Sequence, residues 1–320
     1  MKSDGYLPSD LNTVGHHAAR LESEGFLGAF TAETSHDPFL PLALAAEHTE
    51  RLELGTSIAV AFARNPMTLA YTGRDLNEFS EGRMILGLGS QIKPHITKRF
   101  SMPWSAPAAR MREFVDALHA IWDCWDTGGP LRVRGEHYTH ILMTDFFNPG
   151  PATFGRPSVY LAAVGPMMVR LVAERCDGWM VHPFTTPQHF STVALPQLRG
   201  FMDDIERPHE QVQVALPAFV VTGDNEAQMS KAAIGIKQQI GFYGSTPAYR
   251  GVLDFHGWGD AHTELHALTK SNRWDELADV IDDEMLSTFA VVAEPDDVQS
   301  ALEARYGVLV DRISRYSVAP

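Results

Sequence analysis

Two short apolar runs constrain the fold of this chain more than any other feature of its sequence. They are Leu54–Val60 and Arg83–Ser90, and glycine interrupts or flanks both. Their length and nearly continuous apolar character are typical of strands buried on both faces, as in a parallel sheet. Each run carries small polar residues toward its end, where a barrel strand meets its ligand. The two runs therefore predict an α/β barrel with a cofactor over its strand ends.

Length and charge narrow the class of protein further. The chain has 320 residues, of which 44% are hydrophobic, enough to bury a large core. We expect one domain over residues 1–320, although the length also suits two smaller domains. The formal net charge of -14 and the pI near 5.4 disfavour binding to phosphate backbones and anionic lipid. The sequence thus predicts a small-molecule substrate, with neither nucleic acid nor a membrane as a partner.

The cysteines and the N-terminus predict the compartment. Cys124 and Cys176 are the only cysteines, and their spacing matches neither a Cys-x-x-Cys motif nor a zinc site. This usage suits a reducing compartment. The first residues, Met1–Pro8, lack the apolar stretch of a signal peptide, and no later run is long enough for a membrane span. We therefore expect a cytoplasmic protein.

Strand-like and helix-like segments alternate along the chain with short connections. The first expected strand ends near Tyr6. The others cover residues 27–31, 54–60, 83–89, 159–163, 178–182, 212–221 and 288–292. Expected helices run from a cap at Asp10 or Asn12 to Glu24, from Asp37–Pro38 to Glu50, and over 67–79 after Asn65–Pro66. Apolar positions at helical spacing within 101–126 predict a core-facing helix, and 127–155 is a glycine- and proline-rich excursion.

This alternation implies right-handed parallel crossovers, hence an open doubly wound sheet or a closed barrel. An open sheet that binds a dinucleotide is disfavoured, because the glycine motif that such a sheet requires is incomplete. Gly87 and Gly89 follow a strand, but Ile92 occupies the third glycine position and Pro94 interrupts the next helix. A metal-dependent hydrolase is also disfavoured, because no His, Asp and Glu cluster has ligand spacing. We therefore predict a (β/α)8 barrel without a metal site, with insertions after the fourth strand and before the last strand.

In such a barrel, chemistry belongs to the loops after the carboxyl ends of the strands. That rule selects Asp4, Tyr6, Glu33, His36, 57–64, 90–95, 164–167 and His182. One of these loops has a direct physical interpretation. Gly165 ends a strand and Pro166 starts a helix, which leaves the amides of Gly165, Met167 and Met168 pointing outward. Such a helix N-terminus binds phosphate, although an ordinary strand-to-helix turn has the same sequence pattern.

Taken together, the motifs carry a family resemblance across nearly the whole chain. They are Leu54–Ile58, Arg64–Pro66, Ser80–Arg83, Leu86–Ser90, Ala162–Pro166, Asp177–Trp179 and Ala293–Val298. Their order and spacing resemble the bacterial-luciferase-like superfamily of flavin- and deazaflavin-dependent oxidoreductases. Within that superfamily the chain is similar to the branch that uses coenzyme F420.

The resemblance implies a set of cofactor-binding residues. In the family a non-prolyl cis peptide bulges from the third strand against the back of the isoalloxazine-type ring, and the matching bond here is Ser57–Ile58. The matching contacts to the ribityl chain are Ser90, Gln91 and His95. The matching phosphate site is the turn formed by Val164, Gly165, Pro166 and Met167, the same turn that its own sequence marks as an anion site.

The resemblance departs from the sugar-phosphate dehydrogenases of the family at two places. Ile92 stands where they carry an acidic residue, and their histidine after the second strand aligns with no single position in Glu33–His36. We nevertheless predict that His36 transfers the proton, because imidazole titrates near neutral pH, and that Glu33 orients it or acts as the base. The alternatives are a helix-entry role for His36 and a structural acceptor role for Glu33. His182 and Phe255–Gly259 are further candidates for the substrate side, or are packing residues.

The predicted function is hydride transfer between coenzyme F420 and an organic substrate, a carbonyl or alcohol, an imine or an activated alkene. One alternative is an FMN-dependent monooxygenase on the same scaffold. Another is a flavin-binding protein without turnover, since a fold does not guarantee activity. A homodimer fits the resemblance.

Overall fold

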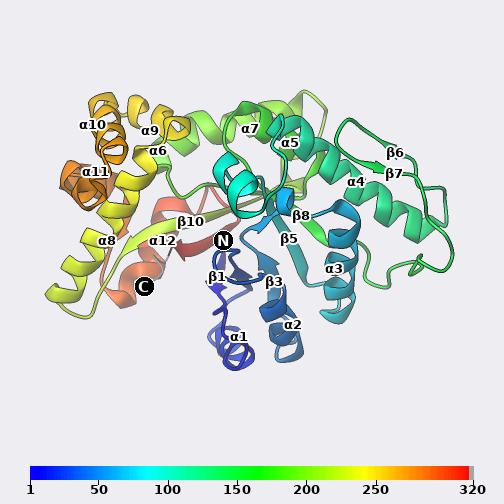
Figure 1. The fold of residues 1–320 in the computed structure, drawn as a ribbon. Helices are drawn as coiled ribbons and strands as arrows, with labels where there is room; N and C mark the ends of the chain where they lie inside the picture. The colour runs from blue at the N-terminus through cyan, green and yellow to red at the C-terminus, as the bar shows by residue number, and fades with distance from the viewer. Residues whose placement is uncertain (317–320) are drawn as a thin grey trace. The chain divides into compact units, whose positions relative to one another are not determined.

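The structure, a computed structural model, describes residues 1–316 of the chain. It divides into two compact units (Figure 1). The N-terminal unit comprises residues 2–180 and 201–213, and the C-terminal unit comprises residue 1, residues 181–200 and the described residues from 214 onward. Each unit has its own strands, helices and buried core.

The N-terminal unit is built on a parallel sheet. Its strands pair in the order β1, β2, β3, β5, β8 and β9, and every pairing is parallel. Their bounds are β1 Lys2–Tyr6, β2 Gly28–Thr31, β3 Glu53–Thr56, β5 Met84–Gly89, β8 Ser158–Ala162 and β9 Gly178–Met180. All residues of β2 and β5 are buried, as the continuous apolar runs predict. Strands follow one another in chain order across the sheet, the arrangement that βα repeats produce.

The third strand is interrupted, whereas the sequence predicts one strand over 54–60. After β3 the chain resumes its pairing in β4 (Ala59–Val60). Gly55 lies opposite Ile85 and Ala59 opposite Leu88, so residues 56, 57 and 58 face only 86 and 87. This one-residue shift of register is a β-bulge. Gly87 makes it possible, because a Cβ at this position would lie 1.8 Å from the carbonyl oxygen of Thr56.

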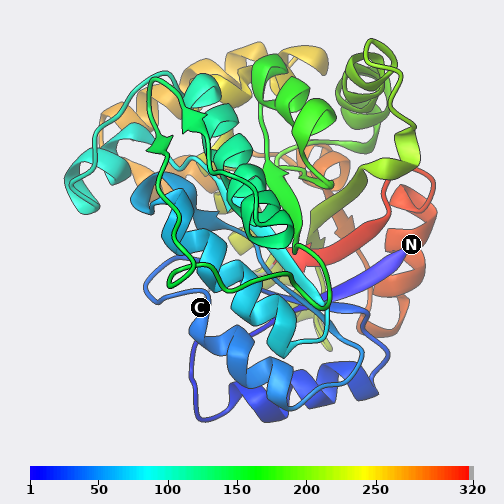
Figure 2. The same ribbon diagram turned by 90° about the vertical axis from the view of Figure 1, so that its right-hand side faces the viewer.

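Helices follow the strands of the N-terminal unit and cover its sheet (Figure 2). The bounds are α1 Val14–Ser23, α2 Leu40–Glu47, α3 Pro66–Phe79, α4 Pro107–Thr127 and α5 Pro166–Arg175, with short turns η1 Ala61–Ala63, η2 His95–Arg99 and η4 His209–Gln211. The core-facing helix within 101–126 is confirmed as α4, where Met111, Phe114 and Leu118 are fully buried. Asn65 caps α3 by accepting a hydrogen bond from the amide of Met67 at 2.8 Å, as expected.

Two predicted helix starts are wrong, and local side-chain hydrogen bonds explain both. The helix expected from Asp37 begins at Leu40, because the Asp37 carboxylate accepts from the amides of Phe39 and Leu40 and forms a turn there. Neither Asp10 nor Asn12 is the N-cap of α1, which is Thr13. Asp10 instead accepts from the backbone and side chain of Asn12 ahead of the helix. Aspartate and asparagine form such turns as readily as caps.

The excursion after α4 holds a small hairpin and a long loop. The hairpin strands are β6 Val133–Arg134 and β7 Thr139–His140, beside α4 in Figure 1. The carboxylate of Glu113 on α4 accepts from the amides of Glu136, His137 and Tyr138, which ties the turn of the hairpin to the helix. Side chains of α3 bind carbonyls of the loop that follows. This excursion is the predicted insertion after the fourth barrel strand.

The C-terminal unit contains three parallel strands, and one of them is missing from the sequence prediction. β10 (Gln213–Val221) pairs with β11 (Ala290–Val292) and with β12 (Arg312–Tyr316). The sequence predicts the last strand at 288–292, which is β11, whereas the last strand is β12. Arg312, Ser314 and Arg315 break the apolar pattern of β12, although Arg312 is fully buried in the fold.

Helices make up most of the C-terminal unit. They are α6 Pro187–His189, α7 Leu195–Asp203 (of which only residues 195–200 belong to this unit), α8 Glu226–Gly244, α9 Arg250–Phe255, α10 Gly259–Lys270, α11 Asp283–Phe289 and α12 Val298–Tyr306, with η3 Phe190–Ala194, η5 Pro247–Tyr249, η6 Trp274–Val280 and η7 Pro295–Asp297. Helices α8, α10 and α11 pack together, yellow to orange in Figure 1, around an apolar core that includes Phe184, Ile240 and Phe289. This helical segment is the predicted insertion before the last strand.

Candidate active site

The bulge after β3 is the most constrained part of the candidate site. The Ser57–Ile58 peptide bond is cis, which confirms the expectation from the resemblance. The amide of Ser57 donates to the carbonyl of Thr31 at 2.6 Å, and the carbonyl of Ile58 accepts from the amide of Glu33 at 3.2 Å. Both residues of the cis bond are partly exposed, so the bulge is accessible to a ligand.

A buried ion pair holds this bulge from the side of β2. The Glu33 carboxylate accepts from the amide of Val60 at 2.6 Å and pairs with the Arg64 guanidinium. Its side chain is only 7% exposed, so little of the carboxylate remains for a substrate. Arg64 also donates to the carbonyl of Val60 and lies within 3.5 Å of Asp37. Sequence spacing gives no sign of this pair, because Glu33 and Arg64 belong to different loops.

His36 lies on the loop after β2, as predicted, and its side chain is exposed. Within residues 1–316 it forms no hydrogen bond or ion pair. The same loop is tied to the segment after β5, because Arg99 donates to the carbonyl of Thr34. The imidazole is therefore accessible at the carboxyl ends of the strands.

The segment after β5 carries Ser90, Gln91 and His95. Gln91 has a φ of 58°, a left-handed conformation that turns the chain sharply at the strand end. Its side-chain carbonyl accepts from the amide of Ile92 at 3.0 Å, which stabilises the turn. Ser90 and Gln91 are partly exposed and His95 is exposed at the start of η2. All three are accessible to a ligand.

The turn between β8 and α5 has the geometry of an anion site. Gly165 has a φ of 80° and a ψ of 157°, and a Cβ placed on it would meet nothing within 4 Å. The first hydrogen bond of α5 is donated by Val169 to Gly165, so the amides of Met167 and Met168 precede it. No side chain caps the helix. Val164, Pro166 and Met167 are exposed, so the approach to these amides is open.

These predicted residues lie on neighbouring strands of one sheet. β3 and β4 pair with β5, and β5 pairs with β8, with Leu88 opposite Leu161. The loops carrying Ser57, Ser90 and Val164 therefore follow adjacent strand ends. Hydrogen bonds from Val60 to Glu33 and from Arg99 to Thr34 connect the loop of His36 to the same group. The structure thus gathers the predicted site residues of the N-terminal unit along one edge of the sheet.

His182 belongs to the C-terminal unit and lies beyond the end of β9, not within it as the sequence predicts. Its ring stacks on Tyr249 with 4.3 Å between centroids and meets Tyr243 edge-on at 4.5 Å. Burial lowers the pKa of His182 to about 3, so the imidazole is neutral at physiological pH. Neither tyrosine could be identified as a contact of His182 from the sequence, because nothing in their spacing distinguishes them from ordinary aromatic residues of a core.

The segment Phe255–Gly259, a candidate lid in the sequence, is packed within the C-terminal unit. His256 lies 2.8 Å from the Thr186 hydroxyl and stacks on Trp258 with 4.7 Å between ring centroids. Burial lowers the pKa of His256. These contacts favour a packing role for the segment.

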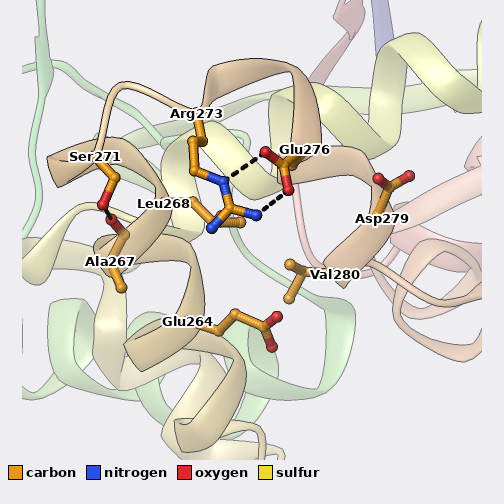
Figure 3. Close-up of a pocket in the computed structure, with 8 residues that line it drawn as sticks. All are labelled: Glu264, Ala267, Leu268, Ser271, Arg273, Glu276, Asp279 and Val280. Atoms are coloured by element: carbon orange, nitrogen blue, oxygen red, sulfur yellow. Dashed lines mark hydrogen bonds and ion pairs between the residues drawn. The ribbon is translucent and has the colours of Figure 1, made fainter.

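The C-terminal unit has a hollow on its surface that contains none of the predicted site residues. It lies between α10 and η6 and is lined by Glu264, Arg273, Glu276 and Asp279, among others (Figure 3). Arg273 and Glu276 pair with each other at its rim. The described residues contain no group of three or more His, Cys, Asp or Glu side chains arranged to hold a metal ion.

Comparison with known proteins identifies the relatives of the chain. A family model described as luciferase-like monooxygenase matches residues 2–312. An uncharacterized protein of Mycobacterium tuberculosis is 50% identical over 98% of this chain and 92% of its own length. A putative coenzyme F420-dependent oxidoreductase of the same species is 29% identical over 89% of this chain and 84% of its own length.

A solved structure shows the fold. The coenzyme F420 dependent tetrahydromethanopterin reductase from Methanopyrus kandleri has a TM-score of 0.77 and 21% identity, covering 98% of this chain and 92% of that one. The fold is a (β/α)8 barrel, as predicted. The protein is an oxidoreductase, as the family model and the relatives show together. More narrowly, the chain belongs to the luciferase-like monooxygenase family. None of the helices in residues 1–316 has the length and apolar character needed to span a bilayer.

Proposed function

We propose that the protein transfers hydride between coenzyme F420 and an organic substrate. The observation that carries the proposal is that the Ser57–Ile58 bulge and the open N-terminus of α5 lie at the same edge of the sheet, on strands separated only by β5. A planar ring needs a shaped wall, and a phosphate needs free amides, and this edge offers both. The named relatives that use coenzyme F420 support the same cofactor.

The residues present fit this cofactor. The amides of Met167 and Met168 would hold its phosphate, because Gly165 leaves their approach open. Ser90, Gln91 and His95 would bind the polyol chain through hydrogen bonds. Ser57 and Ile58 would support the ring from behind. When bound, the deazaflavin supplies hydride chemistry, and the protein supplies placement and exclusion of water.

Glu33 takes a positioning role in this proposal. Its carboxylate already accepts hydrogen bonds from Val60 and Arg64, and those contacts fix the backbone on both sides of the bulge. His36, which is exposed and unbonded within residues 1–316, is the proton-transfer residue. Its imidazole gives or takes the substrate proton that accompanies hydride movement.

Equilibrium binding of coenzyme F420 and of FMN to the purified protein tests the proposal. We expect F420 to bind and FMN to bind at least tenfold more weakly. Reduced F420 should then be oxidised with a panel of ketones, imines and activated alkenes under argon. Tight stoichiometric FMN with oxygen uptake would replace the proposal with a monooxygenase, and F420 binding without any turnover would replace it with a carrier.

A further inference from the structure

One stretch of the N-terminal unit has the opposite charge balance to the rest of the chain. The whole chain has 40 Asp and Glu residues against 26 Lys and Arg residues, yet no Asp or Glu lies between Glu81 and Glu113. The cations of this interval are Arg83, Lys93, Lys98, Arg99, Arg110 and Arg112. Three of them are used inside the fold, because Arg83 and Arg110 donate to backbone carbonyls and Arg112 pairs with Glu174. The other three lie close together in sequence.

We call residues 93–99 the cationic segment. Its side chains Lys93, Lys98 and Arg99 are all exposed. Within residues 1–316 none of the three pairs with a carboxylate, and the amino groups of Lys93 and Lys98 have no hydrogen-bond partner. On a chain with a net charge of -14, three unpaired cations this close together create a local positive potential. The cationic segment is therefore a surface that attracts anions.

The cationic segment is ordered. The side chain of Ile96 is fully buried and anchors the segment to the core. The hydroxyl of Thr97 donates to the carbonyl of Lys93 at 2.9 Å, and the guanidinium of Arg99 donates to the carbonyl of Thr34. A surface whose backbone is already fixed loses less conformational entropy when it binds a ligand.

The position of the cationic segment relates it to the candidate site. It follows β5 directly after Ser90 and Gln91, which are proposed to contact the cofactor. β5 pairs with β8, the strand that leads into the turn at Gly165. The cationic segment and the proposed phosphate site therefore follow adjacent strand ends, and both belong to the N-terminal unit.

The proposed phosphate contacts leave these cations unused. At α5 the phosphate would be held by backbone amides, which bind an anion without a lysine. Beyond its phosphodiester, coenzyme F420 carries a lactyl group and then γ-linked glutamates, each with a free carboxylate. Ammonium and guanidinium groups form charge-assisted hydrogen bonds with carboxylates. The glutamates thus have the charge and the donor preference that the cationic segment requires.

We propose that Lys93, Lys98 and Arg99 bind the glutamate carboxylates of coenzyme F420. The inference rests on the proposed function, because it takes the same cofactor with its phosphate at α5. It goes beyond that function by making affinity depend on the glutamates. Because the three side chains are exposed, each ion pair contributes modestly and is screened by salt. FMN ends at its phosphate and gains nothing from the cationic segment, which gives a physical reason for a preference for F420.

The first experiment compares two forms of the cofactor on the full wild-type chain. Fluorescence titration measures the affinity of F420 without glutamate and of F420 with several glutamates. We expect the glutamates to tighten binding about tenfold at low ionic strength, and about 0.5 M salt to remove most of that gain. Equal affinity for the two forms at low ionic strength overturns the proposal.

The second experiment removes two of the cations. The double variant Lys93→Gln/Lys98→Gln should bind glutamate-bearing F420 about fivefold more weakly and bind the glutamate-free form as wild type does. The matched control is Lys231→Gln/Lys270→Gln, which changes the net charge equally at two exposed lysines of the C-terminal unit and should bind both forms as wild type does. An equal loss in the two double variants, or an equal loss for the two cofactor forms, overturns the proposal.

The third experiment locates the contact directly. The chain has only six lysines, so side-chain spectra of the ¹⁵N-lysine-labelled protein contain few signals. We expect Nζ of Lys93 and Lys98 to shift in the saturated complex with glutamate-bearing F420 and to stay in place with the glutamate-free form. Unshifted signals in both saturated complexes overturn the proposal.

Glutamate-free F420 separates this inference from the proposed function. If that form binds and the glutamates add nothing, the role of the cationic segment is removed and the proposed function stands. If neither form binds to the wild-type chain, the proposed function falls and this inference falls with it.

Discussion

The bulge of the N-terminal unit and the His182 cluster of the C-terminal unit (His182, Tyr243 and Tyr249) fix their geometry by opposite means. The bulge is held by charge and by the backbone, through the Glu33–Arg64 pair and the amides of Val60 and Ser57. The His182 cluster is held by aromatic faces and a single backbone donor. Charged side chains are effective at a bulge because they can hydrogen-bond to backbone amides and carbonyls that lose their partners where the strand is interrupted.

The two histidines differ in the same way. His36 is exposed and has no partner among the described residues, so its side chain is accessible to solvent. His182 is neutral at physiological pH, and its Nδ1 accepts a hydrogen bond from the amide of Phe184, which leaves Nε2 as the protonated nitrogen. The following predictions test this contrast, from the largest expected effect to the smallest.

The largest effect should come from His36→Ala. We expect turnover to fall about 10²–10⁴-fold with cofactor affinity nearly unchanged, because general acid–base catalysis is lost. Single-turnover rates at saturating reduced cofactor isolate this step from binding. His209→Ala, a surface histidine that contacts Asp203, is the control and should leave the rate unchanged. A loss of less than about threefold would return His36 to a helix-entry role.

The next effect concerns the ion pair under the bulge. Arg64→Met leaves the Glu33 carboxylate, only 7% exposed, without its cation. Breaking a buried pair costs about 3–5 kcal/mol, and the partial exposure of Arg64 reduces our expectation to about 2–3 kcal/mol. Urea denaturation measures it. The double variant with Glu33→Gln should be more stable than Arg64→Met alone, and the exposed Arg273→Met should change little. A single variant as stable as wild type contradicts the buried-pair interpretation.

Gly165→Val should weaken cofactor binding at least tenfold and leave the fold intact. A valine side chain would stand between the phosphate and the amides of α5, and a φ of 80° also disfavours it. Gly150→Val is the matched control, since Gly150 has a φ of 78° and open surroundings on a different loop. Titration of cofactor fluorescence measures the affinity. Equal weakening in both variants, or none in Gly165→Val, excludes the phosphate role.

The smallest effect is on pH-dependent stability. The pKa of folded His182 is about 3, below the ordinary histidine value of 6.5, so below pH 6.5 the unfolded chain binds a proton that the folded chain does not. His182 therefore destabilises the fold as the pH falls from 6.5. We expect His182→Phe to remove about 1 kcal/mol of the stability that wild type loses between pH 7.5 and pH 5.5. Urea curves at both pH values measure this, and identical losses in the two proteins would contradict the buried neutral state.

Much of the barrel could be predicted because its signals are local. The apolar runs around Leu54 and Leu86 predict strands, and the Asn65–Pro66 pair predicts the start of α3. The cis bond at Ser57–Ile58 and the open turn at Gly165 were also expected, the first from the family resemblance and the second from residue types. In each case one short segment contains the whole pattern.

The sequence by itself determined most of the parallel strands, several of the helices that follow them and the turn at Gly165 before α5, because these depend on residues a few positions apart. The tertiary structure alone decided that Arg64 neutralises Glu33, that β12 is the last strand with Arg312 buried, and that Tyr249 stacks on His182. The ion pair and the aromatic stack join residues 31 and 67 positions apart in the chain, and β12 pairs with a strand that begins about a hundred residues earlier. No local pattern encodes such a pairing, since it forms only when folding brings separate elements together.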